Sequence, residues 1–337
     1  MNPKVERGLL ALIGALVAGI VIGCGGFFYY ALTEIEIKSL PLQFSLESGR
    51  GLRSAARRME RAGALRHPEF FVTRARLLGE SANIKAGSYE IERPTTPYQL
   101  LQKITQGEVA LVTVTFVEGW TFRQVRRALN DHSDVRHDTR DLDEQEILRR
   151  LGIDAPSAEG LFFPDTYHFG RGGTDLHVLQ RAYRLMQAHL KAQWARRAES
   201  LPLATPYEAL ILASIVEKET ARPADRPLVA AVFVNRLRKR MLLQADPTVI
   251  YGMGETFNGN LRRRDLTTDT PYNTYTRTGL PPTPIAMPGL ESLIVALNPP
   301  ASDVLYFVSR GDGTSHFSRT LGEHERAVTK YQRSGRR

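Results

Sequence analysis

Residues 210–220 of the chain read Leu-Ile-Leu-Ala-Ser-Ile-Val-Glu-Lys-Glu-Thr, an apolar run that ends directly in two glutamates. The run predicts an apolar helix over 207–219. A second strong helix is predicted over 227–240, after a short loop that contains Pro223. These two strong helices begin the part of the chain, from Pro206 onward, in which the character of the sequence changes.

The two glutamates cannot serve one site together. Glu217 and Glu219 are two residues apart, so on a helix their side chains point about 200° away from each other. A carboxyl among apolar groups has a raised pKa, because those groups disfavour its charged form. A glutamate that is protonated near neutral pH can protonate a glycosidic oxygen. The alternative is that both are solvated glutamates at a helix end.

Residues 243–288 form a long irregular stretch that is dense in glycine and proline. Such a stretch inside a compact domain is usually functional. Polar and aromatic side chains of the kind that line sugar-binding grooves occur in and around it. They are Asn235, Gln244, Asp246, Thr248, Tyr272, Asn273 and Tyr275. Ordinary turn chemistry is the alternative explanation, with Asp246 and Pro247 starting a helix and Asn273 satisfying a loop.

Residues 36–109 predict a small subdomain with the order β-α-α-β. Its expected elements are a strand at Phe44–Leu46, helices at Leu52–Ala62 and Pro68–Leu78, and a strand over 86–91. This order resembles a LysM module, a small glycan-binding fold. Any other small α+β subdomain would have the same order.

The rest of the chain predicts a larger mixed α+β domain, so the fold class is α+β. Helices are expected over 97–105, 121–129, 143–151, 176–199, 290–297 and 323–332, strands over 110–117 and 162–169, and a hairpin over 304–317.

Composition limits the function classes only broadly. The chain has 337 residues with 42% hydrophobic and 24% charged residues, which is ordinary for a globular protein. Its net charge of +9 suggests an anionic partner, which could be nucleic acid, lipid headgroups or an acidic polymer, or simply a basic soluble surface. The single cysteine, Cys24, excludes an intramolecular disulfide and a cysteine-based zinc site.

Residues 8–32 contain no charged side chain. About 20 apolar residues suffice to span a bilayer, so we expect a retained transmembrane anchor. Lys4 and Arg7 precede the segment, which predicts a cytoplasmic N-terminus. Two alternatives are a cleaved signal peptide and a lipobox that ends at Cys24, although the apolar run continues for eight residues beyond that cysteine.

Several segments together resemble the YceG-like endolytic murein transglycosylase family in order and spacing. The central ones are Ala213–Thr220, Val232–Leu237, Leu243–Gly252, Tyr272–Tyr275 and Gly279–Pro282, and the segments Val117–Gly119 and Glu159–Tyr167 lie upstream. The resemblance covers nearly the whole chain and is most specific over 207–290. It implies three parts, namely a cytoplasmic tail and anchor over 1–35, a LysM-like subdomain over 36–109 and a catalytic domain over 110–337.

In this family the second glutamate of the Glu-Lys-Glu-Thr motif is catalytic, which corresponds to Glu219. The resemblance implies cleavage of the bond between MurNAc and GlcNAc in nascent peptidoglycan strands, without cofactor or metal, beside penicillin-binding synthases. It also implies a bacterial inner-membrane protein whose catalytic domain is periplasmic. We expect Glu217 to orient a neighbour, for example through an ion pair with an arginine.

Two other functions remain open at this point. A hydrolytic muramidase would cut the same bond with water, and a non-catalytic membrane-anchored scaffold would only bind glycan. Nucleic-acid binding is disfavoured, because the basic residues are spread over many helices and the expected topology removes the domain from most nucleic acid.

Overall fold

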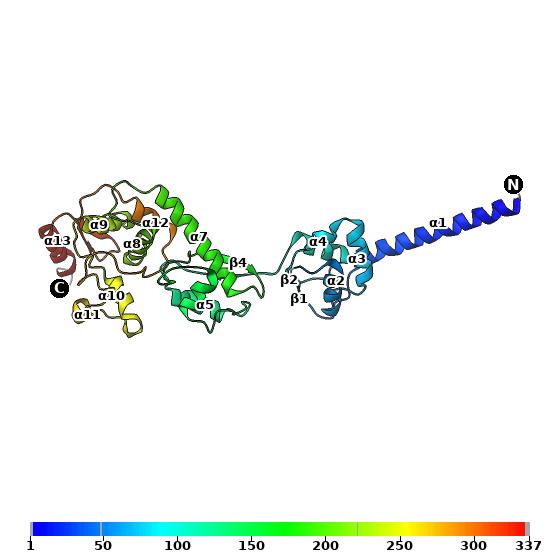
Figure 1. Ribbon diagram of the computed structural model, residues 1–337, viewed down its shortest axis with the longest axis horizontal. Helices are drawn as coiled ribbons and strands as arrows, with labels where there is room; N and C mark the ends of the chain where they lie inside the picture. The colour runs from blue at the N-terminus through cyan, green and yellow to red at the C-terminus, as the bar shows by residue number, and fades with distance from the viewer. Residues whose placement is uncertain (1–2, 48, 221, 334–337) are drawn as a thin grey trace. The chain divides into compact units, whose positions relative to one another are not determined.

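The computed structural model describes residues 3–47, 49–220 and 222–333 of the chain (Figure 1). The chain forms two compact units. One comprises Met1–Val112 with His168–Gly172, and the other comprises Thr113–Tyr167 with Gly173–Arg337.

The chain begins with helix α1 (Pro3–Leu32), which contains the uncharged segment. Its last turn packs on the N-terminal unit, where Ala31 is fully buried and the Tyr30 hydroxyl donates to the backbone oxygen of His67 at 3.0 Å. The side chain of Cys24 lies outside the described residues. In the part of the chain whose side chains are described, no helix is both long and apolar enough to cross a membrane.

The N-terminal unit has the predicted β-α-α-β order. Strands β1 (Leu42–Leu46) and β2 (Gly87–Ile91) pair antiparallel, with Phe44 opposite Tyr89 and the two rings stacked at 5.5 Å. Helices α2 (Leu52–Arg61) and α3 (Pro68–Leu77) follow β1, then the short 3-10 helix η1 (Glu80–Ala82). After β2 comes α4 (Pro97–Gln106).

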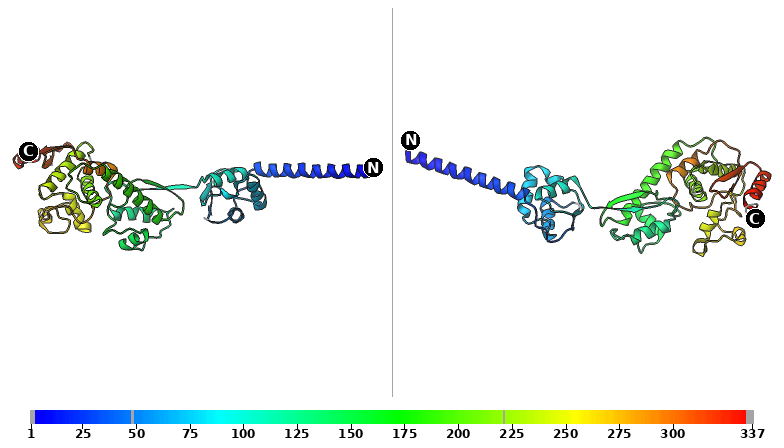
Figure 2. Two further views of the ribbon diagram at one scale, coloured as in Figure 1. Left: turned by 45° about the horizontal axis from the view of Figure 1, so that its top comes forward. Right: turned by 180° about the vertical axis from the view of Figure 1, so that it is seen from behind.

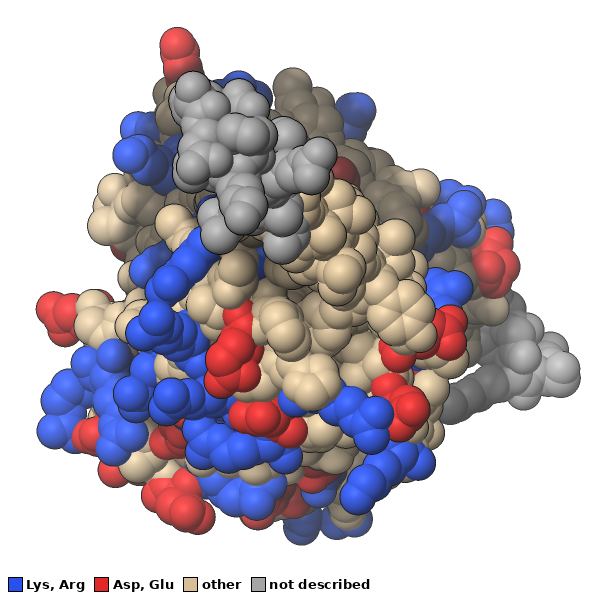
Figure 3. Space-filling model, turned by 90° about the vertical axis from the view of Figure 1, so that its right-hand side faces the viewer, with Lys and Arg blue, Asp and Glu red and all other residues tan. Residues whose placement is uncertain are grey.

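Helix α2 buries one face in this core and exposes the other. Leu52 and Met59 are buried, whereas Arg57, Arg58 and Arg61 are exposed, which is the pattern of an amphipathic helix. Lysine and arginine side chains gather on the face of the molecule shown in Figure 3, with acidic residues between them.

Strands β3 (Leu111–Thr115) and β4 (Thr166–Gly170) pair with each other. The sequence predicted β4 to start at Phe162, but it starts four residues later. Pro164 has no N–H for a strand ladder, and Phe162 is buried against the ring of Phe122 at 5.2 Å instead.

The C-terminal unit is built around helix α8 (Pro206–Glu219), whose residues 209–216 are all buried. Helices α7 (Asp175–Ala195), α9 (Arg226–Arg238) and α12 (Leu290–Leu297) pack against it (Figure 1). A helix that is apolar on every side needs such neighbours on every side. Helices α5 (Phe122–Asp131) and α6 (Glu144–Leu151) precede α7 in the same unit.

The stretch predicted to be irregular contains two α-helices and one 3-10 helix. Helix α10 (Asp246–Met253), the 3-10 helix η2 (Gly254–Thr256) and α11 (Arg263–Thr267) form the yellow part of Figure 2. The chain then returns through α12 to the hairpin of β5 (Tyr306–Ser309) and β6 (Ser315–Ser318), which packs beside α9. Helix α13 (Leu321–Val328) and the π-helical turn η3 (Thr329–Arg333) follow.

Candidate active site

Helix α8 places Glu219 at its C-terminal end, in a groove of the C-terminal unit. The helix starts at an N-cap, Thr205, whose hydroxyl accepts the backbone N–H of Glu208 at 3.2 Å, and Pro206 occupies the first turn. Its eight buried residues fix it in the core, and Glu219 is its last residue. The position of this side chain therefore follows from the packing of the whole helix.

Glu219 lines a groove with a volume of about 530 Å³. Four other parts of the chain meet it there, represented by Arg236 of α9, Asp246 at the start of α10, Tyr275, and the strands and helix that close the chain. The groove is therefore assembled from segments that span more than 100 residues of the chain, from Glu219 to Gln332.

The acidity of Glu219 suits a proton donor near neutral pH. The pKa of this carboxyl is raised to about 7, mainly by burial and in part by the charge of Asp246, while the charge of Arg236 acts in the opposite direction. The negative end of the α8 dipole also disfavours the carboxylate. Its Oε2 atom is buried and has no hydrogen-bond partner among the described residues. This oxygen is therefore available to a bound ligand.

Three of the predicted groove residues lie in the groove with Glu219, namely Gln244, Asp246 and Tyr275. The Tyr275 hydroxyl donates to Asp246 Oδ1. Gln244 has a left-handed backbone with a φ of 52°, and its side-chain oxygen accepts from Arg236 Nη1 at 3.2 Å. A non-glycine residue in this conformation stores strain, which is common at binding sites.

Arg236 connects the chain segments that form the groove. The side chain is buried and donates to the backbone oxygens of Leu305 at 2.7 Å and Leu243 at 2.8 Å. It thereby ties α9 to the segment before α10 and to the start of the hairpin. Arg236 was not among the residues predicted for the site, although a charge two residues after the apolar run Ala230–Val234 was a usable signal.

The other four predicted contacts are not among the described residues that line the groove. Asn235 is buried and donates to the backbone oxygens of Ser302 and Val304. Thr248 is fully buried and bonds to Thr274, and Asn273 is buried with its amide on three backbone oxygens. Tyr272 is partly exposed, and its hydroxyl bonds to Thr283 at 2.9 Å.

These four side chains therefore support the groove rather than line it. Asn273 is the clearest case, because its side-chain oxygen also accepts the backbone N–H of Tyr275 at 2.8 Å. The alternative explanation for Asn273, that its side chain satisfies the backbone of a loop, agrees with the structure.

Glu217 points away from the groove. Its Oε2 accepts the backbone N–H of Gly289 at 2.9 Å, and its Oε1 lies 3.6 Å from Arg226 Nη2. Both side chains of this ion pair are almost completely buried. Glu217 thereby fastens the end of α8 to the start of α12 and of α9, while Glu219 faces the ligand side.

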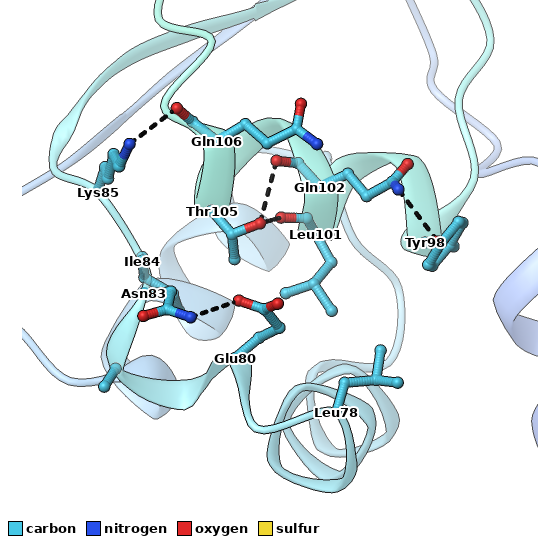
Figure 4. A pocket seen from close by; sticks show the side chains of 11 residues that line it. Leu78, Glu80, Asn83, Ile84, Lys85, Tyr98, Leu101, Gln102, Thr105 and Gln106 are labelled. Atoms are coloured by element: carbon cyan, nitrogen blue, oxygen red, sulfur yellow. Dashed lines mark hydrogen bonds between the residues drawn. The ribbon is translucent and has the colours of Figure 1, made fainter.

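A hollow of about 720 Å³ in the N-terminal unit provides a comparison (Figure 4). Several of its polar side chains bond to one another or to the backbone. Asn83 donates to Glu80 at 2.8 Å, Gln102 to Tyr98 at 3.0 Å, and Lys85 to the Gln106 oxygen at 3.0 Å. The groove at Glu219, which keeps an unsatisfied buried oxygen, is the stronger candidate for chemistry.

Fold and site together define a glycan-cleaving type of centre, a single buried acid in a polar and aromatic groove. A match to the YceG-like family extends over residues 44–330, and the chain belongs to this family.

Named relatives agree with this family. The chain is 30% identical to an endolytic murein transglycosylase of Bacillus subtilis (strain 168), over 91% of this chain and 90% of that protein. It is 27% identical to an endolytic murein transglycosylase of Streptococcus pneumoniae (strain D39), over 96% of this chain and 65% of that protein. A crystal structure of a yceG-like protein from Listeria monocytogenes matches with a TM-score of 0.51 and 27% identity, over 84% of this chain and 97% of that one.

Proposed function

We propose that the chain is an endolytic murein transglycosylase, a lyase that cleaves peptidoglycan glycan strands within the strand. The observation that carries the proposal is Glu219, a single carboxyl with a pKa of about 7 and a free buried oxygen in a polar groove. The relatives of the same name, aligned over most of the chain, support it.

The reaction needs one group that first gives and then takes a proton. The Glu219 carboxyl donates its proton to the oxygen that links MurNAc C1 to GlcNAc, and the C1–O bond breaks. The MurNAc C6 hydroxyl then attacks C1, and the Glu219 carboxylate accepts the proton of that hydroxyl. The new C1–O6 bond gives a 1,6-anhydro-MurNAc end, no water is consumed, and Glu219 returns to its protonated form.

Asp246 has a different part in this cycle. Its side chain is held by the Tyr275 hydroxyl and contributes negative charge beside Glu219. That charge keeps Glu219 protonated and stabilises the positive charge that develops at C1 in the transition state. Gln244 and Tyr275 serve as contacts for the sugar.

Product analysis tests the proposal. Wild-type protein and Glu219→Gln are incubated with uncross-linked glycan strands, and the new ends are identified by mass spectrometry. We expect anhydro ends from the wild type and a loss of about 10³-fold or more in rate for the variant, because an amide cannot transfer this proton. Reducing ends would identify a hydrolytic muramidase, and full activity of Glu219→Gln would remove Glu219 from the mechanism.

The location and partners of the protein are a further part of the proposal. The uncharged residues 8–32 anchor the chain in the bacterial inner membrane, with the N-terminus cytoplasmic and the catalytic domain periplasmic. There it would end nascent strands beside penicillin-binding synthases, and the β-α-α-β unit would hold glycan as a LysM-like module. Protease digestion of spheroplasts tests the topology, since only a periplasmic domain is cut from outside.

A further inference from the structure

A second residue that lines the groove of Glu219 has a buried polar atom without a partner. The atom is Nδ1 of His324, on helix α13. Among the described residues, this nitrogen has no hydrogen-bond partner, as is the case for Glu219 Oε2. Buried polar atoms are nearly always paired, so two unpaired ones on residues that line the same groove indicate a ligand that pairs them.

The imidazole is held in place by ring stacking and by its position on helix α13. Its ring stacks on Tyr306 of β5, with the centroids 5.2 Å apart and an interplanar angle of 22°. Its backbone N–H bonds to Thr320, the N-cap of α13, whose hydroxyl accepts from Glu323 at 3.3 Å. Val328, one helical turn further along, lines the same groove. Helix α13 thus presents one face to the groove.

The surroundings keep this histidine uncharged. Burial lowers its pKa, the charges of Arg236 and His316 lower it further, and Glu325 acts in the opposite direction. The guanidinium of Arg236 lies 5.2 Å from the centroid of the Tyr306 ring on which His324 stacks. A neutral imidazole offers one hydrogen-bond donor and one acceptor, which suits a sugar hydroxyl or an acetamido group.

We propose that His324 is a substrate-binding residue, whose Nδ1 hydrogen-bonds a hydroxyl or acetamido group of the saccharide that occupies the groove. The inference rests on the proposed function for the identity of the ligand as a glycan. It assigns a direct contact with the ligand to helix α13, whose Val328 also lines the groove.

Two substitutions separate this role from ring packing. His324→Phe keeps an aromatic ring to stack on Tyr306 and removes both nitrogens. His324→Asn loses the stacking but places an amide atom near the position of Nδ1. Binding of fluorescently labelled, uncross-linked glycan strands is measured by anisotropy in the Glu219→Gln background, so that no cleavage occurs. The KM and kcat of the single variants are measured with Glu219 intact.

We expect His324→Phe to weaken binding about threefold to tenfold, the usual contribution of one hydrogen bond, and to raise KM more than it lowers kcat. We expect His324→Asn to bind more tightly than His324→Phe. His189→Phe is the matched control. The ring of His189 also packs against an aromatic ring, that of Phe163, with the centroids 4.4 Å apart, but His189 is not among the described residues that line the groove. This control variant should bind like the parent.

Binding by His324→Phe equal to that of the parent would overturn the inference, as would His324→Asn binding less tightly than His324→Phe with all variants folded to the same thermal midpoint. Failure of the proposed function looks different, because the wild type itself would then produce no anhydro ends.

Discussion

At the residue scale, the acidity of Glu219 results mainly from burial and is adjusted by two neighbours with opposite charges. Asp246 raises the pKa of Glu219 and Arg236 lowers it, while burial supplies the largest part of the shift to about 7. Because the proton donor must be protonated, we expect kcat/KM to fall about tenfold per pH unit above a pH of about 7.

Asp246→Asn should move this decline to lower pH. The substitution removes a negative charge, so Glu219 ionises more readily, and we expect a shift of about 0.5–1 pH unit. Asparagine still offers an oxygen to the Tyr275 hydroxyl, so the geometry is retained. The measurement is kcat/KM between pH 5 and 9, with Asp269→Asn as control. Asp269 is exposed and paired with Arg277, and it is not among the described groove-lining residues. An unchanged profile for Asp246→Asn would show that its charge does not act on Glu219.

Residue chemistry alone predicted the site only in part. The segment made two glutamates candidates, because Glu217 and Glu219 closely follow seven mostly apolar residues. The choice of Glu219 between them came from the resemblance to the family. Asn273 and Thr248 could not be separated from groove residues, because the same amide and hydroxyl groups serve turns and sugars equally well. His324 carries no local signal, since it enters the groove only through the packing of a hairpin and a helix 100 residues away.

At the element scale, periodic segments were predicted well. The helices at 52–61, 68–77 and 290–297 lie within one residue of their expected ends, because their apolar spacing and flanking residues agree. Helix α10 was considered only as an alternative, because its start at Asp246 and Pro247 lies among residues that also form turns. The strand expected from Phe162 was wrong for its first four residues, because burial of apolar side chains there does not depend on strand pairing.

Gly160 lies very close to Pro284 within the C-terminal unit. A Cβ atom at this position would lie 2.5 Å from Cβ of Pro284, and the residue has a φ of +77°. We expect Gly160→Ala to lower the free energy of unfolding by about 2–4 kcal/mol, because a rigid ring must move and the backbone is strained. Gly152→Ala is the control, since Gly152 has a φ of +69° but no atom within 4 Å of its Cβ position.

Denaturant unfolding of the two variants separates the two causes. Gly152→Ala should lose only about 1–2 kcal/mol from backbone strain. Equal losses for both variants would mean that the contact with Pro284 yields without cost.

At the scale of the whole molecule, the chain divides into two units with separate cores. The sequence predicted a small N-terminal and a large C-terminal part from the order of their elements, yet it gave no indication that residues 168–172 belong to the N-terminal unit. Residues 168–172 belong to β4 and the turn after it, and β4 pairs with β3, which lies about 50 residues earlier in the chain. Both tryptophans, Trp120 and Trp194, lie in the C-terminal unit, so their fluorescence reports on its unfolding alone.

Tryptophan fluorescence can report how the ionisation of Glu159, a buried carboxyl that the proposed reaction does not use, affects the stability of the C-terminal unit. Glu159 is 4% exposed and accepts hydrogen bonds from the Phe122 backbone N–H at 3.0 Å and the Tyr251 hydroxyl at 3.1 Å, which connects the start of α5 to α10. Burial raises the pKa of Glu159 from 4.5 to about 7. Between these two values the folded unit binds more protons than the unfolded chain. The stabilising contribution is therefore complete below about pH 4.5 and is lost as the pH rises through 7.

Glu159→Gln should remove this dependence, because a neutral amide of the same size does not titrate. Relative to wild type, we expect the variant to gain stability between pH 5 and pH 8.5, by up to about 3 kcal/mol at ~1.4 kcal/mol per pKa unit. The measurement is urea unfolding followed by tryptophan fluorescence at several pH values. The exposed Glu199→Gln serves as control and should follow the wild type. Parallel stability curves for Glu159→Gln and wild type would show that Glu159 keeps its ordinary acidity in the folded unit, and that the link between α5 and α10 does not depend on its protonation.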